Sequence, residues 1–161
     1  MTRFYDIDEA NEALPDVERI LLDLRDQRAE LIRLRDAVLA ASRPGDDEGP
    51  DRGPSESPDA ETGDAAGADA DPDTPNPEAA AARRLMRLRM QGLIDQMQAG
   101  VTRLVERDVT LREIEAGLID FPALASGRQI WLCWRLGEGD IEWWHELDDG
   151  FGGRRRLTDL T

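Results

Sequence analysis

Apolar residues recur every three or four positions along two long segments of the chain, a spacing that places them on one face of an α-helix. In the first segment they run from Leu14 to Val38, which predicts a helix over about residues 15–42. A polar stretch follows, and the spacing resumes at Met86 and continues to Leu118. The pattern therefore predicts two long helices separated by a polar connection.

Capping signals mark the beginning of the first helical segment. Asp6 and Glu9 have the spacing of a capping box, which predicts that a short helix begins at Ile7. Pro15 either breaks or kinks this short helix or lies in the first turn of the main helix, because a proline within a helix removes a hydrogen bond and clashes with the preceding turn. The sequence leaves both alternatives open.

The second helix is predicted to begin at Pro77, with Asn76 as its N-cap, and to run to about Ala116 before Gly117 ends it. Two helices of about 40 residues would each span roughly 50–60 Å. We expect them to pack as an antiparallel, coiled-coil-like hairpin.

The connection between the helices has an unusual composition. Residues 43–77 are mainly Pro, Gly, Asp, Ser and Ala, with no Val, Ile, Leu or aromatic residue. Such a segment cannot offset the entropy lost on ordering, so we expect a disordered linker inside a single domain that spans residues 1–161. Residues 44–82 hold twelve of the 35 acidic residues and one arginine, so most of the net charge of −15 belongs to this connection.

All four tryptophans, the single cysteine and the single histidine lie within residues 131–145. Residues 129–136 and 141–148 read as two strands, and residues 137–140 are typical of the turn between them. In the resulting register the paired residue numbers sum to 277: Trp134 lies opposite Trp143, Cys133 opposite Trp144, Leu132 opposite His145, and Arg135 opposite Glu142. The first pair predicts an aromatic contact on the face that packs against the helices, and the last predicts an ion pair.

This register has a chemical consequence, because alternate residues of a strand point to opposite faces of the sheet. Cys133 and His145 would point in opposite directions, so we expect neither a nucleophile–base pair nor a shared metal ion. A two-stranded hairpin is marginal alone, so residues 3–5 or 155–157 are expected to add a third strand. The predicted fold is α+β, a long two-helix hairpin with a small Trp-rich antiparallel sheet at its open end.

Polar residues around this segment form the candidate site. The catalytic candidates are His145, Glu146 and Asp120, and the ligand-binding candidates are Arg154, Asp148 and Asp149. Histidine with carboxylates suits acid–base chemistry, and an arginine suits an anion. His145 also fits a buried core position, and we expect no metal ion or cofactor, since one histidine leaves only carboxylates as further ligands.

Cysteine content and hydropathy restrict the compartment. One cysteine cannot form an internal disulfide. No apolar run approaches the roughly 18 residues that a membrane-spanning helix needs. These features predict a cytoplasmic protein that does not bind a membrane.

Several short motifs resemble a bacterial family known only as a domain of unknown function, number 2203. They are IDEANEALP at residues 7–15, GLIDFP at 117–122, LCWRLGE at 132–138, and WHE at 144–146 with GFGGR at 150–154. The resemblance covers the whole chain apart from the linker. It implies no established activity, so a function has to be inferred from the residues themselves.

The leading expectation is a non-enzymatic interaction or structural module. Two helices alone leave part of an apolar stripe uncovered, so we expect a homodimer through the helices or binding to a protein partner. On this expectation, alanine at Leu24 and Leu104 would weaken the dimer.

Two alternatives remain open. In the first, the protein is a small-ligand or metal-dependent enzyme whose pocket is formed by Asp120, His145, Glu146 and Arg154. In the second, which is weaker, it associates with nucleic acid through two arginine clusters, Arg83, Arg84, Arg87 and Arg89 on the second helix and residues 154–156. The acidic residues spread over the rest of the chain argue against nucleic acid as a partner.

Overall fold

The computed structural model describes residues 3–42 and 76–160 of the chain. The described residues form two long helices, α1 (Ile7–Ala41) and α2 (Pro77–Val105), followed by a sheet. Its strands are β1 (Thr110–Glu113), β2 (Leu118–Ala125), β3 (Arg128–Arg135), β4 (Trp143–His145) and β5 (Arg155–Arg156), with short 3-10 helices η1 (Phe151–Gly153) and η2 (Leu157–Asp159). Most of the expected linker, residues 43–75, lies outside the described residues, so its disorder stays a prediction.

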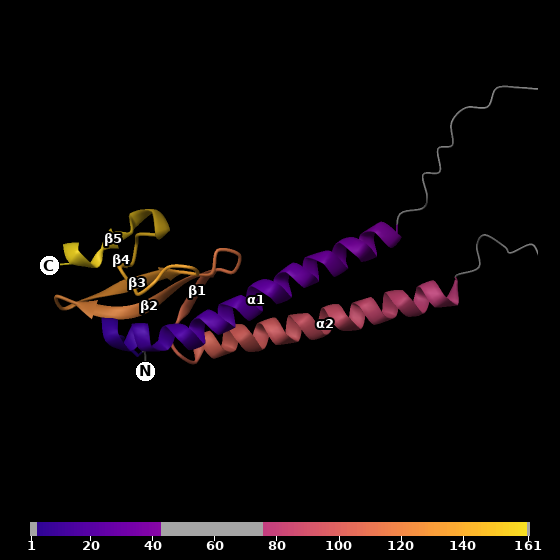
Figure 1. Cartoon of the computed structure of the whole chain (residues 1–161), viewed down its shortest axis with the longest axis horizontal. Helices are drawn as coiled ribbons and strands as arrows, with labels where there is room; N and C mark the ends of the chain where they lie inside the picture. The colour runs from indigo at the N-terminus through magenta and orange to yellow at the C-terminus, as the bar shows by residue number, and fades with distance from the viewer. Residues whose placement is uncertain (1–2, 43–75, 161) are drawn as a thin grey trace, which may run out of the picture.

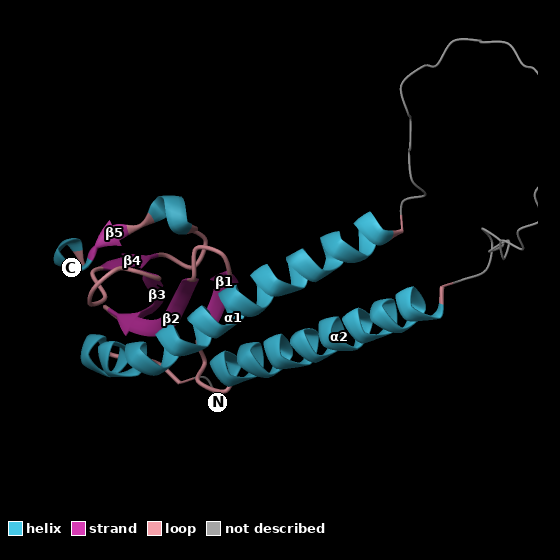
Figure 2. Cartoon of the chain, turned by 45° about the vertical axis from the view of Figure 1, so that its right-hand side comes forward, coloured by secondary structure: helices cyan, strands magenta, loops and turns pink. Residues whose placement is uncertain are grey.

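The two helices pack side by side as an antiparallel hairpin, and the sheet lies at the open end of this hairpin (Figure 1). The sheet is antiparallel, with the strands in the order β1-β2-β3-β4-β5. The first turns of α1 lie along one side of the sheet, whereas η1 and β5 lie on the side away from the helices (Figure 2). This arrangement confirms the α+β fold. Within the described ranges, neither helix has an apolar stretch long enough to cross a membrane.

The beginning of α1 follows the predicted capping box. The carboxylate of Asp6 accepts a hydrogen bond from the backbone N–H of Glu9 at 2.7 Å, and the Glu9 carboxylate accepts one from the N–H of Asp6 at 3.2 Å. Pro15 lies inside the continuous helix α1, so it neither breaks the helix nor lies in the first turn of a separate one, and a kink at Pro15 stays a prediction. The neighbouring Leu14 and Val17 are buried, so packing of this turn compensates for the hydrogen bond that the proline cannot donate.

The end of α2 differs from the prediction. Asn76 caps the helix as expected, accepting a hydrogen bond from the backbone N–H of Glu78 at 3.0 Å, but α2 ends at Val105 rather than near residue 116. The chain reverses at Asp108, whose φ of 56° is outside the helical range, and continues into β1. Pairing with β2 gives Thr110, Leu111 and Glu113 cross-strand partners, with an irregularity at Arg112, and this pairing outweighs the helix-like apolar spacing of the segment.

The core lies between one face of the sheet and the helices. It contains Ala10, Leu14, Val17, Leu21 and Leu24 of α1, Leu104 of α2, and Ile119, Phe121, Ile130, Leu132, Trp134 and Trp144 of the sheet. Leu24 and Leu104 are therefore buried in the core of a single chain, and the effect of alanine there on a dimer stays a prediction.

The register between β3 and β4 differs by one residue from the predicted one. Trp131 pairs with His145, Leu132 with Trp144, and Cys133 with Trp143, so the residue numbers sum to 276 rather than 277. The reason is the connection, which spans residues 136–142 and is held by two hydrogen bonds. From outside the hairpin, the Asn11 side chain of α1 accepts from the Ile141 backbone N–H at 2.8 Å, and within the hairpin the Trp134 indole donates to the Gly139 carbonyl at 2.7 Å.

The shift moves every β4 side chain to the opposite face. Trp134 lies in the core while Trp143 lies on the outer face, so the predicted aromatic pair was wrong. The predicted ion pair of Arg135 with Glu142 was wrong as well, because Glu142 pairs with Arg156 at 3.6 Å.

Of the two candidates for a further strand, residues 155–157 are confirmed in part, since Arg155 and Arg156 form β5 beside β4. Residues 3–5 form no strand, although the Tyr5 backbone N–H donates to the Pro122 carbonyl at 2.8 Å. Strands β1 and β2 were not predicted from the sequence, and they complete the five-stranded sheet.

Candidate functional site

Three side chains with metal-binding or acid–base chemistry meet on the outer face of the sheet. Asp120 of β2 is paired with Cys133 of β3, and His145 of β4 lies one step along the same face. All three are buried, and their ligating atoms lie within 4.8 Å of one another. The prediction that Cys133 and His145 point to opposite faces was wrong, because it depended on the register that the structure corrects.

The hydrogen bonds of His145 fix the orientation of its ring. Nδ1 lies 2.8 Å from the backbone carbonyl of Glu146, which can only accept, so Nδ1 carries a hydrogen. Nε2 lies 3.2 Å from Oδ2 of Asp120. His145 is thus a buried histidine with a polar role, held between a backbone carbonyl and a carboxylate.

Asp120 is the centre of the cluster. Its Oδ2 accepts a hydrogen bond from Nε of Arg112 at 2.6 Å, in addition to facing His145. Its Oδ1 is buried and has no hydrogen-bond partner among the described residues. A buried carboxylate oxygen without a donor is costly, so this atom marks the point where the cluster is incomplete.

Cys133 is not set up as a nucleophile. Burial raises the pKa of its thiol to about 12, and the neighbouring Asp120 carboxylate contributes to the increase. The thiolate is the reactive form of cysteine, so this thiol is inert near neutral pH. The raised pKa argues against a Cys133–His145 nucleophile–base pair, which is a different reason from the strand register that the sequence suggested.

A short segment covers the cluster from the outside. Leu147, Asp149, Gly150 and Phe151, which follow β4, line a cavity of about 160 Å³ together with Asp120, Cys133, His145, Arg112 and Leu118. Arg154 secures this segment, since its guanidinium donates to the Glu138 carboxylate at 2.9 and 2.7 Å and to the Cys133 carbonyl at 3.4 Å. It also lies over the rings of Trp143 and Phe151 at 4.9 and 4.7 Å. The cavity is consequently small and largely closed.

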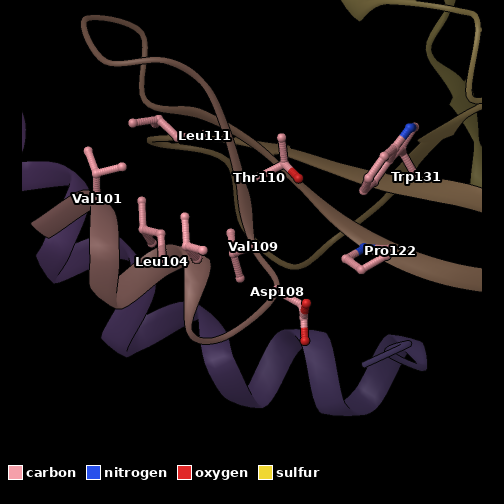
Figure 3. Close-up of a pocket in the computed structure, with 9 residues that line it drawn as sticks. Val101, Leu104, Asp108, Val109, Thr110, Leu111, Pro122 and Trp131 are labelled. Atoms are coloured by element: carbon pink, nitrogen blue, oxygen red, sulfur yellow. The ribbon is translucent and has the colours of Figure 1, made fainter. Parts of the chain in front are cut away.

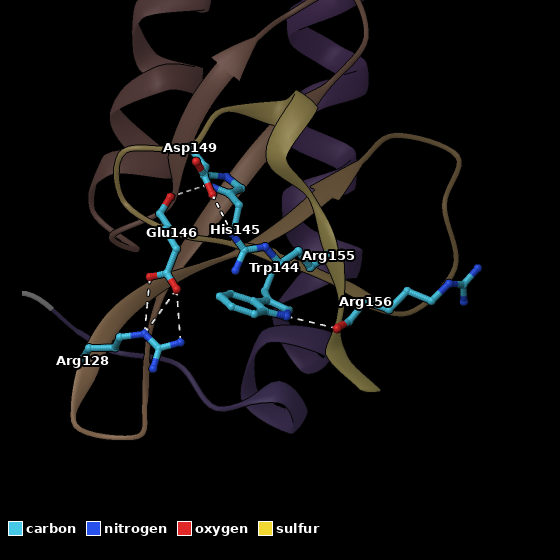
Figure 4. Close-up of polar contacts among 7 residues, drawn as sticks. All are labelled: Arg128, Trp144, His145, Glu146, Asp149, Arg155 and Arg156. Atoms are coloured by element: carbon cyan, nitrogen blue, oxygen red, sulfur yellow. Dashed lines mark hydrogen bonds and ion pairs between the residues drawn. The ribbon is translucent and has the colours of Figure 1, made fainter. Parts of the chain in front are cut away.

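The remaining predicted site residues do not join this cavity. Glu146 pairs with Arg128 at 3.1 Å at the edge of the sheet (Figure 4), and Asp148 is exposed. Asp149 lines the cavity but pairs with Arg155 at 3.3 Å. Of the predicted set, the structure brings Asp120, His145 and Asp149 to the cavity and places Glu146, Asp148 and Arg154 outside its lining.

A second feature is an open apolar groove on one side of the helix pair. It has a volume of about 570 Å³ and is lined by Leu31 of α1 and by Ile94, Met97 and Val101 of α2, with Gln98 and Thr102. Through Val101 it continues into a hollow of about 330 Å³ at the junction of α2 and the sheet, where Leu111, Pro122 and Trp131 lie (Figure 3). We call this continuous surface the apolar flank.

The comparison with protein-family models identifies what kind of chain carries these two features. Residues 3–157 match the model of DUF2203, which is described as an uncharacterized conserved protein. The chain belongs to the DUF2203 family. No curated protein and no solved structure matches the chain. The DUF2203 match contains the buried cluster, the covering segment and the apolar flank, so all of them lie within the family's own boundaries.

Sequence reasoning on this DUF2203 chain missed two residues of the cavity, Arg112 and Cys133. Arg112 had been assigned to a helix that in fact ends before it, and Cys133 had been separated from His145 because the predicted register placed His145 on the core face. A signal was present for Asp120, because polar Asp120 between apolar Ile119 and Phe121 is the alternation of a half-buried strand.

The arginine clusters in this DUF2203 chain are partly engaged within the molecule. Arg89 forms an ion pair with Glu30, and Arg155 and Arg156 pair with Asp149 and Glu142. Arg154 is held by Glu138. These contacts reduce the basic surface on which a nucleic-acid reading would depend.

Proposed function

We propose that this protein is a non-enzymatic interaction module that self-associates through its helical hairpin. The observation that carries the proposal is the packing of the distal part of the hairpin. Beyond Leu24 on α1 and before Leu93 on α2, none of the described side chains is buried. Yet this part contains Leu31, Ile32, Leu34, Val38 and Leu39 of α1, and Leu85, Met86, Leu88 and Met90 of α2.

Helices derive most of their stability from packing an apolar face, and a helix pair whose apolar side chains are at most partly buried gains less of that contribution. A second hairpin packed against the first would complete a four-helix arrangement and bury these side chains. We therefore propose that the partner is a second copy of this chain. The two copies would be related by a two-fold axis, so that both contribute the same surface to the interface.

The two sides of the hairpin differ in a way that indicates which one is used. On one side, Glu30 and Arg89 form an ion pair across the helices, close to polar Gln27 and Gln96. On the other side lies the apolar flank. Burial of the apolar flank would remove mainly apolar surface from water, which is favourable. Burial of the polar side would desolvate charged groups, which is costly.

The size of the surface fits a stable dimer. From residue 77 to residue 101, α2 rises about 36 Å, and a pair of helices is about 20 Å wide. The product, about 700 Å², is the footprint of one whole side of the hairpin, of which the apolar flank is one part, and a standard interface buries roughly 800 Å² of accessible surface per partner.

The test uses the full chain and two variants that introduce the same side chain two positions apart on α2. Ile94→Glu places a carboxylate on the apolar flank, and Gln96→Glu places one on the polar side. We expect the wild type and Gln96→Glu to sediment as dimers at tens of micromolar, and Ile94→Glu to sediment as a monomer with an unchanged circular dichroism spectrum. A wild type that is monomeric at 100 μM, or equal dissociation by both variants, would contradict the proposal.

The enzyme alternative receives less support from the site. It needs Asp120, His145, Glu146 and Arg154 around one pocket, whereas Glu146 and Arg154 are engaged by Arg128 and Glu138. A cytoplasmic location remains part of the proposed function.

A further inference from the structure

We propose that Asp120, Cys133 and His145 form a binding site for a divalent transition-metal ion of the Zn²⁺ class, located under the segment that follows β4. The three residues come from three adjacent strands and are buried on the outer face of the sheet. None of the three residues lines the apolar flank, although Trp131 of the flank is the cross-strand partner of His145, and this inference does not depend on self-association.

The donor set suits such an ion. A thiolate sulfur, an imidazole nitrogen and a carboxylate oxygen are the three ligand types that Zn²⁺ takes in proteins. With bonds of about 2.0–2.3 Å, two ligands of a tetrahedral ion lie about 3.4–3.8 Å apart. The ligand atoms of the cluster are all within 4.8 Å of one another, so a movement of about 1 Å brings them onto one ion.

The unsatisfied hydrogen-bonding groups of the cluster point to a cation independently. Because Nδ1 of His145 donates to the Glu146 carbonyl, the lone pair of a neutral imidazole is on Nε2, and it faces the Oδ2 acceptor of Asp120. Oδ1 of the same carboxylate is buried without a donor. Oδ2 already accepts a hydrogen bond from Arg112, so the acceptor atoms without a donor are Nε2 of His145 and Oδ1 of Asp120, and a positive centre beside them satisfies both.

The surroundings of His145 match those of metal-bound histidines. A histidine that binds a metal through one ring nitrogen commonly donates its other N–H to a carbonyl or a carboxylate, which fixes the tautomer and the ring orientation. Here the Glu146 carbonyl holds that position on Nδ1. Nε2 is consequently the free ligand atom, directed at the other two ligands.

Binding would remove the proton from Cys133. As the metal–sulfur bond forms, the thiol S–H breaks and its proton leaves to solvent, so one proton is released for each ion bound. Three protein ligands leave the fourth position of a tetrahedral ion open. Asp149, which lines the cavity beside the cluster, is the described side chain that can fill it or orient a water molecule there.

Arg112 competes with the ion for the carboxylate of Asp120. Its guanidinium Nε donates to Oδ2 of Asp120 at 2.6 Å and lies over the Trp131 ring at 5.0 Å. The side chain is 40% exposed, so it can leave toward solvent while Oδ1 stays available to the metal. Arg112→Gln is therefore expected to bind the ion more tightly than the wild type, by at least about tenfold, since it removes a fixed positive charge next to the ligands.

The composition of the chain makes the test specific, because it contains one cysteine and one histidine. The full chain, treated with a chelator and dialysed, is titrated with Co²⁺ as a spectroscopic probe, and Zn²⁺ is then added. We expect one ion per chain, the visible spectrum of tetrahedral cobalt, a near-ultraviolet thiolate-to-cobalt charge-transfer band, and loss of both signals as Zn²⁺ replaces Co²⁺. The charge-transfer band can arise only from Cys133.

Ligand variants and a matched control complete the experiment. Cys133→Ser should abolish the charge-transfer band, and Asp120→Asn and His145→Gln should each weaken Co²⁺ binding at least about tenfold. Asp148→Asn changes an exposed carboxylate two or more residues from the ligands and should leave binding unchanged. A folded wild type that binds no stoichiometric Co²⁺ would overturn the proposal. An octahedral spectrum without the charge-transfer band would overturn it as well, because it would indicate that Co²⁺ is bound by carboxylates of the acidic segment alone.

Discussion

The Nε2 atom of His145 lies 3.2 Å from Oδ2 of Asp120, and both side chains are buried although 25 residues separate them in the chain. They are brought together by β3, which pairs with the strand of each. The sequence predicted the strand that contains His145 but not β2, which contains Asp120.

The first prediction concerns the stability of this pair. Asp120→Ala removes the acceptor of the Arg112 guanidinium and leaves a space beside His145 at a fully buried position. We expect the free energy of unfolding to fall by about 2–3 kcal/mol in urea denaturation without added metal. Asp148→Ala, at an exposed position, is the control and should change stability by less than about 0.5 kcal/mol. Equal losses in the two variants would show that the buried pair contributes nothing specific.

The second prediction concerns the reactivity of Cys133. Burial and the Asp120 carboxylate raise the pKa of this thiol to about 12, so only about one molecule in 10⁴ carries a thiolate at pH 8. An aromatic disulfide reagent should therefore react with the native protein at least about 100-fold more slowly than with the protein in denaturing urea. Fast labelling of the folded chain would mean that the segment covering the outer face opens readily.

The third prediction uses the contact of Glu138 with Arg154. Burial acts to raise the pKa of Glu138, but hydrogen bonds from the Arg154 guanidinium and from the Arg135 backbone N–H, with the charges of both arginines, leave it lowered. A lowered folded-state pKa stabilises the fold above the ordinary glutamate pKa, and that stability is lost as the pH falls through the folded-state value. Urea unfolding should show Glu138→Gln to be about 1 kcal/mol less stable than the wild type at pH 7, and the difference should shrink below pH 4. If the difference in unfolding free energy between Glu138→Gln and the wild type stays constant with pH, the loss of stability would come from packing rather than from the charge of Glu138.

The fourth prediction tests the turn between β1 and β2. Gly117 has a φ of 62°, and a Cβ atom at this position would lie 2.6 Å from Cβ of Leu136. Gly117→Ala should lower the free energy of unfolding by about 2–3 kcal/mol, measured by thermal or urea denaturation. Gly92→Ala is the matched control, because Gly92 lies inside α2 with open space around its Cα, and there alanine should stabilise the protein by up to about 1 kcal/mol.

Local signals in the sequence were sufficient for the first turns of both helices and for the overall architecture. The Asp6–Glu9 capping box and the Asn76 cap are formed as predicted, because each depends on groups a few residues apart. The helical hairpin and the Trp-rich sheet at its open end also follow from periodicity along the chain. These features need no information about which distant segments meet.

Only the tertiary structure decided where α2 ends, which strands surround β3, and the register of β4. The connection after β3 is anchored by Asn11 of α1, a contact with no counterpart in the local sequence, and it shifts β4 by one residue. A one-residue shift exchanges the two faces of a strand, so it turned His145 from the core toward Asp120 and Cys133. The sequence alone shows that the chain contains Asp120, Cys133 and His145. That these three side chains lie together depends on cross-strand pairing, which is determined by contacts between segments distant in the chain.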